Sequence, residues 1–207
     1  MIYEYMLFKT PFTCLISGPT GSGKSELLFN ILKNINKYFD ESPTKIIYCY
    51  GAFQEKFKEF PYIQFNHGLI DTDDLNSNEK NLIIIDDLMD DALNDKEISH
   101  LFTRGSHHKN ISVFLLTQNF FSTGKYSRTI SLNSNYLIIF NNPRDKLQIS
   151  YLARQMYPSN SQFLIQTYEN ATNKPHGYLF IDNKQDTNPD LRIQSDILKD
   201  TYCLKKD

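Results

Sequence analysis

"FTCLISGPTGSGKS", residues 12–25, joins an apolar run directly to a cluster of glycines. The apolar part predicts a buried β-strand, and "KSELLFNILKNINKYF", residues 24–39, has the apolar spacing of a helix. Three glycines and a proline lie between them. Because glycine is costly to order, such a cluster indicates a tight turn or a ligand that approaches the backbone closely.

The cluster matches the pattern G-x-x-x-x-G-K-S, in which backbone N–H groups and a helix N-terminus surround a phosphate. The pattern requires a strand before it and a helix after it, and both are predicted here. We therefore expect ATP to bind, with Lys24 reaching its β- and γ-phosphates and the Ser25 hydroxyl on Mg²⁺. A glycine-rich turn that precedes a lysine by chance is the alternative. The expected nucleotide-binding residues are Gly18, Pro19, Thr20, Gly21, Ser22, Gly23, Lys24 and Ser25.

Two acids end the run "NLIIIDDLM", residues 81–89, which is typical of a central parallel strand. We expect Asp86 to be associated with Mg²⁺ and Asp87 to orient or deprotonate the attacking water, at a strand tip adjoining the glycine loop. Many NTPases carry Glu at the second position, and Asp is shorter by one methylene. The alternative for Asp87 is a helix N-cap. Asp90 and Asp91 are expected in the first turn of the following helix.

A third predicted strand, "ISVFLLTQN" at residues 111–119, also ends in polar residues. Gln118 is the first candidate to sense the γ-phosphate or hold the lytic water, with Asn119 second; ordinary strand-end polarity is the alternative. Phosphoryl transfer often needs an arginine, which can come from a neighbouring subunit. Arg104 and Arg144, both expected near the same edge of the sheet, are equal candidates, and either could instead be structural or contact DNA.

Apolar strands alternate with helix-like segments along the chain, which predicts an α/β fold with helices on both faces of a mostly parallel sheet. We expect an ATPase domain over residues 1–183 and a C-terminal strand or tail over 184–207, with a short strand near 191–194. Helices are expected over residues 54–60 and 95–108. Ligands of such sheets bind at the carboxyl ends of the strands.

The composition of the 207 residues is ordinary for a globular chain, with 40% hydrophobic and 22% charged residues. The net charge of -2 excludes a globally basic surface, so nucleic acid would need a local patch or an assembled ring. The N-terminus is a poor signal peptide, and no apolar run is long enough to span a membrane. The three cysteines have no paired spacing, which fits a reducing compartment.

Together, "PFTCLISGPTGSGKS", "LIIIDDLMD", "GSHHKNISVFLLTQNFF", "LNSNYLIIFNNPRD" and "GYLFID" resemble the genome-packaging ATPases of double-stranded DNA viruses. The likeness is to those of adintoviruses, Polinton-like elements and virophages, which are similar to the poxvirus packaging ATPase and belong to the FtsK/HerA group of P-loop motors. It runs from about residue 11 to residue 182.

The resemblance implies a P-loop NTPase fold of the RecA or FtsK/HerA type and a homo-oligomeric ring, usually a hexamer. Such a ring threads double-stranded DNA into a preformed viral capsid at its portal vertex. The resemblance also implies Gln118 as the polar sensor and an arginine acting between subunits. It places the protein in the infected host cell, in the cytoplasm or nucleus, and possibly in the virion, with no membrane partner.

A DNA pump must grip any sequence, so it should contact phosphates rather than bases. The segments "RGSHHKN" (104–110) and "STGKYSR" (122–128) offer Lys109, Lys125 and Arg128, each of which could instead be a solvated charge. Two other functions remain open: a helicase or recombination-type ATPase, and a nucleotide-gated assembly switch with little turnover. No guanine-reading N-K-x-D and no arginine-rich lid is present, which disfavours a GTPase and a small-molecule kinase.

Overall fold

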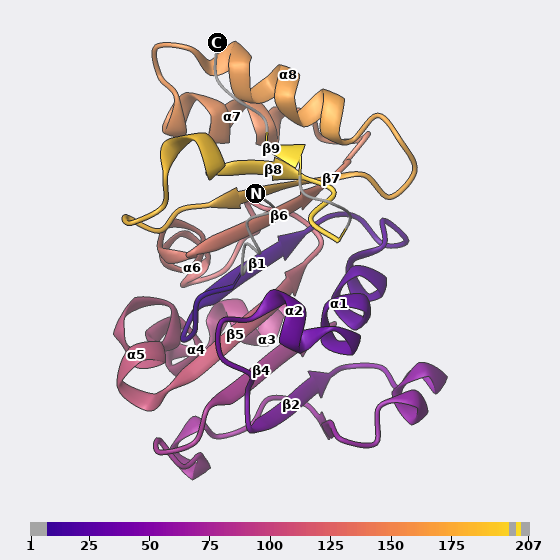
Figure 1. The fold of residues 1–207 in the computed structure, drawn as a ribbon, viewed down its shortest axis with the longest axis vertical. Helices are drawn as coiled ribbons and strands as arrows, with labels where there is room; N and C mark the ends of the chain where they lie inside the picture. Colours follow the sequence, from indigo (N-terminus) through magenta and orange to yellow (C-terminus); the bar gives the residue numbers. More distant parts are fainter. Residues whose placement is uncertain (1–7, 199–201, 204–207) are drawn as a thin grey trace.

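The computed structural model describes residues 8–198 and 202–203. Its described strands form one nine-stranded sheet in the order β3-β2-β4-β5-β1-β6-β7-β8-β9 (Figure 1). Pairing is parallel from β3 to β6 and antiparallel from β6 to β9. The strands are β1 (Thr13–Ser17), β2 (Lys45–Tyr50), β3 (Gln64–His67), β4 (Asn81–Asp86), β5 (Ile111–Thr117), β6 (Tyr136–Phe140), β7 (Tyr178–Asp182), β8 (Ile193–Ser195) and β9 (Tyr202–Cys203).

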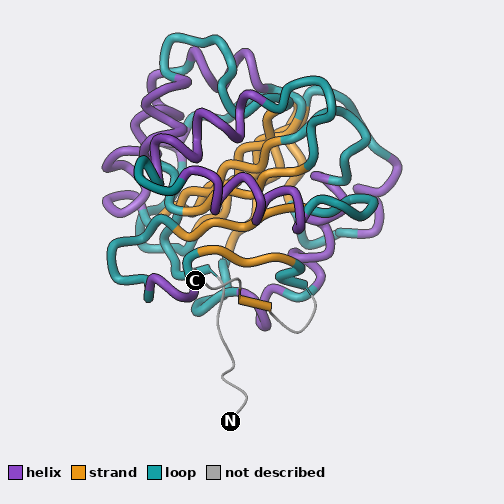
Figure 2. Tube along the Cα trace, turned by 90° about the horizontal axis from the view of Figure 1, so that it is seen from above, coloured by secondary structure: helices purple, strands orange, loops and turns teal. Residues whose placement is uncertain are grey.

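Helices cover both faces of this sheet, which lies between them in Figure 2. One face packs against α1 (Lys24–Lys33) and α2 (Ile35–Tyr38). The other packs against α3 (Met89–Asn94), α4 (Lys96–His100), α6 (Ser127–Asn133), α7 (Leu147–Met156) and α8 (Ser161–Ala171). The predicted α/β architecture is therefore confirmed. No helix among the described residues is both long and apolar enough to cross a lipid bilayer.

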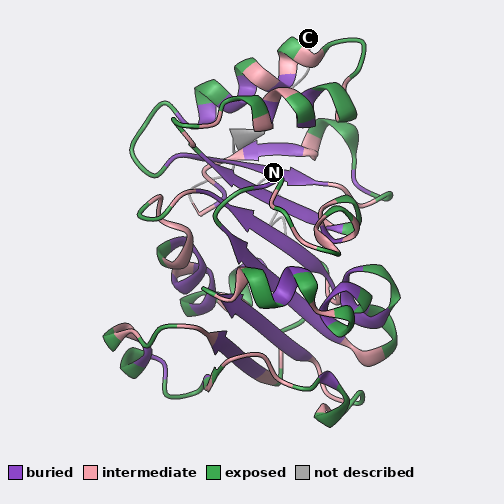
Figure 3. Cartoon of the chain, turned by 180° about the vertical axis from the view of Figure 1, so that it is seen from behind, coloured by how far each residue is buried: buried purple, intermediate pink, exposed green. Residues whose placement is uncertain are grey.

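The central strands are buried on both faces, as Figure 3 shows. In β4, Leu82 and Ile84 pack on the α1 side, whereas Ile83 and Ile85 pack on the opposite side. Successive side chains of a strand point to opposite faces, so a strand covered on both sides must be apolar throughout. This explains the continuous apolar runs of the sequence.

The strand order differs from the sequence prediction at one place that matters for the site. The tips of β1 and β4 were expected to adjoin, but β5 lies between them and pairs with both. Ser17 at the end of β1 pairs with Thr117 at the end of β5. The polar residues after β5 are therefore held between the glycine loop and the two acids.

The helix expected over 95–108 runs from α4 through a π-helical turn, η3 (Leu101–Gly105), into α5 (Ser106–Lys109). The helix expected over 54–60 is a 3₁₀ turn, η1 (Glu55–Glu59). Two further 3₁₀ turns are η2 (Thr72–Asp74) and η4 (Pro189–Leu191). Strand β3 and helix α6 were not predicted, because both are short and partly exposed.

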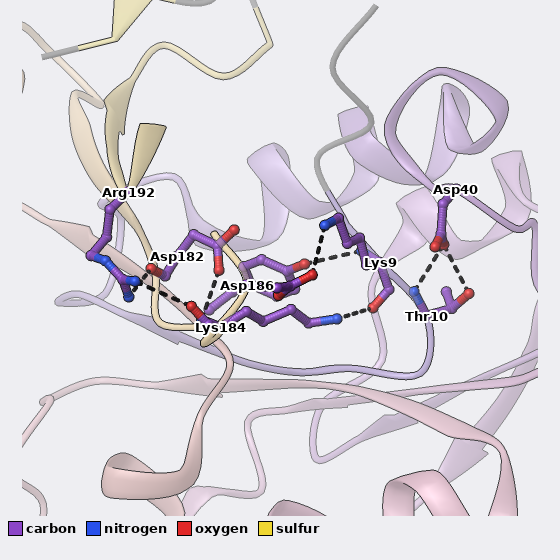
Figure 4. Close-up of polar contacts among 8 residues, drawn as sticks. Lys9, Thr10, Asp40, Asp182, Lys184, Asp186 and Arg192 are labelled. Carbon is purple, nitrogen blue, oxygen red and sulfur yellow. Dashed lines mark hydrogen bonds and ion pairs between the residues drawn. The ribbon is translucent and has the colours of Figure 1, made fainter. Parts of the chain in front are cut away.

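A polar cluster at the amino end of β6 joins the first described residues to the segment after β7 (Figure 4). Lys9 Nζ pairs with Asp186 Oδ2 at 2.9 Å, and Lys184 Nζ donates to the Lys9 carbonyl oxygen at 2.6 Å. Arg192 donates to the carbonyl oxygens of Asp182 and Lys184 at 2.9 and 3.2 Å. These bonds hold the segment between β7 and β8 in place. β8 is the short strand predicted near 191–194.

Candidate active site

A cleft of about 730 Å³ opens at the carboxyl ends of β1, β4 and β5. This volume is within the range of small-molecule sites. Its walls come from the glycine loop, the start of α1, the turn after β4 and the end of β5. The lining residues are Thr20, Gly21, Gly23, Lys24, Ser25, Glu26, Gln54, Asp86, Asp87, Leu88, Met89, Asp90, Asp91, Leu116, Thr117 and Gln118.

The backbone of the glycine loop adopts conformations in which residues other than glycine would be strained. Gly23 has φ +106°, and a Cβ there would lie 3.1 Å from His176 Nδ1. Gly21 has φ +78°, also in the region that favours glycine. A Cβ at Gly18 would lie 2.6 Å from the Cβ of Phe140. The turn is therefore shaped by its glycines, and His176 Nδ1 contacts the Ser22 carbonyl oxygen across it at 2.9 Å.

Helix α1 begins at Lys24, and its N-cap, Gly23, supplies no side-chain bond. The first N–H groups of the helix are thus available to an anion, which the helix dipole also favours. Lys24 Nζ donates to the carbonyl oxygens of Gly18 and Pro19, the latter at 3.1 Å. Burial lowers the pKa of Lys24, while the nearby charges of Asp86 and Asp87 act in the opposite direction.

Asp86, the last residue of β4, is 7% exposed and accepts two hydroxyl hydrogen bonds on Oδ2. Ser25 Oγ donates at 2.9 Å and the Tyr48 hydroxyl at 2.7 Å. Burial, followed by the charge of Asp86, raises the pKa of Tyr48, so this hydroxyl stays protonated and acts as a donor. The structure thus brings the two residues predicted for Mg²⁺, Ser25 and Asp86, into direct contact.

The oxygen donors of this site suit Mg²⁺. Within residues 8–198 no three His, Cys, Asp or Glu side chains are grouped to hold a metal ion. Mg²⁺ does not need such a cage, because it keeps several waters and usually binds one or two carboxylates together with substrate phosphates. The Ser25 hydroxyl and Asp86 carboxylate beside the glycine loop fit that pattern.

Asp87 follows β4 with φ +58° and its exposed side chain lines the cleft. It does not cap a helix, because the N-cap of α3 is Leu88 and no side-chain cap bond is made. Asp is enriched among residues with positive φ. This conformation gives a physical reason for Asp at a position where other NTPases carry Glu. Asp90 and Asp91 lie in the first turn of α3, as predicted.

Gln118 comes directly after β5, the neighbour of β4 in the sheet, and lines the cleft together with Thr117. Thr117 is 3% exposed, and its Oγ1 has no hydrogen-bond partner in the described part of the chain. A buried, unpaired hydroxyl is costly, so it indicates a site for a polar ligand or a water. Asn119 lies outside this cleft, in an adjacent hollow of about 500 Å³.

The two candidate arginines lie in different places. Arg144 lines the adjacent hollow beside Pro19, Thr20 and Gln118, and its guanidinium has no hydrogen bond or ion pair with any described residue. Arg104 lies in η3, exposed, in the second half of a helical segment that returns to the amino edge of the sheet. The expectation that Arg104 lies near the catalytic edge is wrong, because the chain must travel back along the sheet before β5 can begin parallel to β4.

The three cations considered for DNA are also separated. Lys109 Nζ is bonded to Thr72 Oγ1 at 2.9 Å and Asp73 Oδ1 at 2.6 Å, at the amino edge of the sheet. Lys125 is exposed and lies over the Tyr126 ring, 5.1 Å from its centroid. Arg128 is exposed on α6. Of these three cations, Lys125 and Arg128 make no ion pair with a described residue and are available to bind phosphates.

Several residues of the site were not identified from the sequence. Tyr48 lies inside an apolar strand, where nothing in the local pattern separates it from core residues. Thr117 belongs to the polar strand end recognised in the sequence, where Gln118 and Asn119 were the preferred candidates. Gln54 follows β2 and His176 precedes β7, so both come from segments remote in sequence from the glycine loop. The residues that were identified follow a known spacing, whereas Tyr48, Gln54 and His176 meet the site only through tertiary contacts.

No protein-family model matches the chain, and no curated protein matches it. Solved structures do match. The chain resembles the genome packaging NTPase B204 of Sulfolobus turreted icosahedral virus 2 in complex with AMPPCP, with a TM-score of 0.58, 14% identity, and 89% of this chain and 96% of that chain covered. The DNA-packaging ATPase B204 of Sulfolobus turreted icosahedral virus gives a TM-score of 0.54, 14% identity, and 84% and 93% coverage.

A third match is the pCW3 conjugation coupling protein TcpA with ATPγS, at a TM-score of 0.50 and 17% identity. It covers 84% of this chain and 58% of that one. At these identities the comparisons concern the fold. The chain has the α/β fold of P-loop NTPases, with a mostly parallel central sheet flanked by helices.

Proposed function

We propose that this chain is an ATPase that moves double-stranded DNA into a viral capsid. The observation that carries the proposal is the meeting, in one cleft, of the glycine loop, the Ser25–Asp86 pair, Asp87 and Gln118. The fold similarity to viral packaging ATPases over nearly the whole chain supports the same proposal.

Each residue would have one task in ATP hydrolysis. The loop N–H groups and Lys24 bind the β- and γ-phosphates, so Lys24 exchanges its contacts with the Gly18 and Pro19 carbonyl oxygens for phosphate oxygens. Ser25 and Asp86 would hold Mg²⁺, which supplies charge neutralisation of those phosphates. Asp87 orients and deprotonates the attacking water, and Gln118 holds that water or contacts the γ-phosphate.

The acidity of the cleft supports a requirement for the metal. Lys24 is the one cation among its lining residues, whereas Asp86, Asp87, Asp90 and Asp91 all line it. A triphosphate entering this field needs a divalent cation between it and the carboxylates. We therefore infer that nucleotide without Mg²⁺ binds weakly.

The movement of DNA is the second part of the proposal. We infer a homo-oligomeric ring, most simply a hexamer, that grips DNA phosphates through Lys125 and Arg128 and docks at a capsid vertex in the infected cell. An origin among viruses like adintoviruses, Polinton-like elements, virophages and poxviruses is part of the same proposal, on the motifs described above. Arg144, in the hollow next to the cleft, is preferred over Arg104 as the arginine shared between subunits.

The test is ATP hydrolysis measured with and without duplex DNA, alongside the mass of the assembly. Wild-type protein should hydrolyse ATP faster when DNA is present. Lys24→Ala should lose hydrolysis and ATP binding, and Asp87→Asn should bind ATP but not turn it over. Asn tolerates positive φ as Asp does, so this variant removes the charge without straining the backbone.

DNA affinity should fall steeply with salt, since phosphate contacts release counterions. Hydrolysis that is slow and indifferent to DNA would favour a nucleotide-gated switch instead. Strand separation on a forked substrate would favour a helicase. Normal turnover by Asp87→Asn would remove that residue from the catalytic role.

A further inference from the structure

Tyr48 reaches the metal-binding carboxylate from a neighbouring strand. It lies in β2, pairs in register with Ile84 of β4, and its hydroxyl donates to Asp86 Oδ2 at 2.7 Å. Ile84 and Asp86 are two residues apart, so they share one face of the sheet with Tyr48. The side chain is 0% exposed. A hydroxyl buried this deeply needs a partner, and the partner here is the carboxylate of the candidate active site.

The tyrosine ring is held firmly by aromatic neighbours. Phe29 of α1 stacks on it with ring centroids 5.6 Å apart and planes 4° from parallel. Phe57 and Phe65 lie against it at 5.2 and 5.5 Å between centroids. Phe29 is four residues after Ser25 on the same helix, and residues at this spacing share a helix face. The Phe29–Tyr48 contact therefore joins the helix that carries Ser25 to the strand that carries Tyr48.

Both hydroxyl bonds end on the same carboxylate oxygen, Oδ2 of Asp86. Two donors from different elements define the plane and rotation of a carboxylate more closely than one donor can. Neither bond uses Oδ1, which is thereby left for the metal or one of its waters. Partners that orient a metal ligand from behind commonly change metal affinity when they are removed.

We propose that Tyr48 is a positioning residue that sets the orientation of the Asp86 carboxylate and thereby the Mg²⁺ affinity of the nucleotide complex. This rests on the proposed ATPase function. The competing account is that Tyr48 only satisfies a buried hydroxyl and contributes to stability. The two accounts differ in what happens to Mg²⁺ dependence, so Mg²⁺ dependence is the measurement that decides.

The experiment uses Tyr48→Phe, which keeps the ring and removes the hydroxyl. Binding of a fluorescent ATP analogue is followed while Mg²⁺ is titrated, and then again in EDTA. The half-saturating Mg²⁺ concentration should rise about tenfold, the lower end of the range seen for outer partners of metal ligands. Affinity in EDTA should stay the same, because the hydroxyl contacts no part of the nucleotide site except Asp86 and Ser25.

Tyr136→Phe is the matched control. Tyr136 is also 0% exposed and belongs to the same core cluster, but its hydroxyl accepts from the Lys9 backbone N–H at 3.0 Å, at the opposite edge of the sheet. Its loss should lower thermal stability without changing the Mg²⁺ titration. An equal Mg²⁺ midpoint in wild type, Tyr48→Phe and Tyr136→Phe would overturn the proposal.

Asp86→Ala separates this proposal from the function on which it rests. A raised Mg²⁺ midpoint in Asp86→Ala with an unchanged one in Tyr48→Phe rejects only the role of Tyr48. An unchanged midpoint in both rejects Asp86 as the metal residue. If Tyr48→Phe does not fold, Phe57→Leu is used instead, because it loosens the packing of the Tyr48 ring and keeps the hydroxyl. A smaller rise in the half-saturating Mg²⁺ concentration is expected, and no rise overturns the proposal.

Discussion

Gly51 lies where β2 ends, against the turn that carries Asp87. Its backbone N–H donates to the Asp86 carbonyl oxygen at 3.2 Å. A Cβ built on Gly51 would lie 2.3 Å from the Asp87 carbonyl oxygen and 3.3 Å from Asp87 Oδ2. Gly51→Ala therefore pushes directly on the residue proposed to activate water, without adding or removing a charge.

The magnitude follows from that contact. Real Cβ atoms stay at least 3.0 Å from such neighbours, so the two backbones must separate by about 0.7 Å. The obstacle is main chain, which cannot rotate away as a side chain can. A displacement of the order of 1 Å at a reacting group costs roughly 10²-fold in rate, or about 2.7 kcal/mol in the activation free energy. Overpacking of this kind also lowers stability by about 1–3 kcal/mol.

The assay compares the turnover number for ATP with the affinity for an ATP analogue. Gly51→Ala should lose about 10²-fold in turnover and keep the nucleotide affinity measured in EDTA, since Lys24 and the glycine loop are not touched. Gly68→Ala is the control: Gly68 has φ +86°, and a Cβ there would have no neighbour within 4 Å, so alanine is strained there without pressing on the acids. It should lower stability and leave turnover unchanged. Equal turnover in Gly51→Ala and wild type would show that Asp87 need not be held in this position.

Two further predictions concern the arginines and the cluster at the opposite edge of the sheet. If Arg144 acts between subunits, a mixture of the inactive variants Lys24→Ala and Arg144→Ala should regain hydrolysis, because some interfaces then combine an intact loop with an intact arginine. A mixture of Lys24→Ala with Arg104→Ala should show no such gain. No gain in either mixture would show that no arginine is shared between subunits. Burial raises the pKa of the Asp182 carboxyl, so the folded chain keeps a proton that the unfolded chain has lost, and the free energy of unfolding falls as the pH rises through that interval. Asp182→Asn should therefore melt at a higher temperature than wild type at pH 7, with the difference closing below about pH 4, and a lower melting temperature at pH 7 would contradict this.

The predictions from sequence succeeded where the chemistry is local. The glycine loop stands between a strand and a helix because three consecutive segments carry their own signals: apolar run, glycines, helical spacing. Asp86 ends its strand for the same reason. The position of Arg104 was predicted wrongly because helical spacing shows that a helix exists. It does not show which residues of that helix lie near the carboxyl edge of the sheet and which lie near the amino edge. The helix predicted over 54–60 is a 3₁₀ turn for a related reason, since a short amphipathic segment does not specify its hydrogen-bond pattern.

By itself the sequence determined that a glycine-rich turn between a strand and a helix, two strand-end acids and a polar strand end exist, because each depends on residues adjacent in the chain. The tertiary structure alone decided that β5 separates the loop from the acids and that the hydroxyl of Tyr48 meets Asp86. It also decided that Gly51 lies so close to Asp87 that no Cβ fits between them. The physical reason is that strand order depends on which apolar faces the crossover helices cover, and a contact between strands distant in sequence depends on that order.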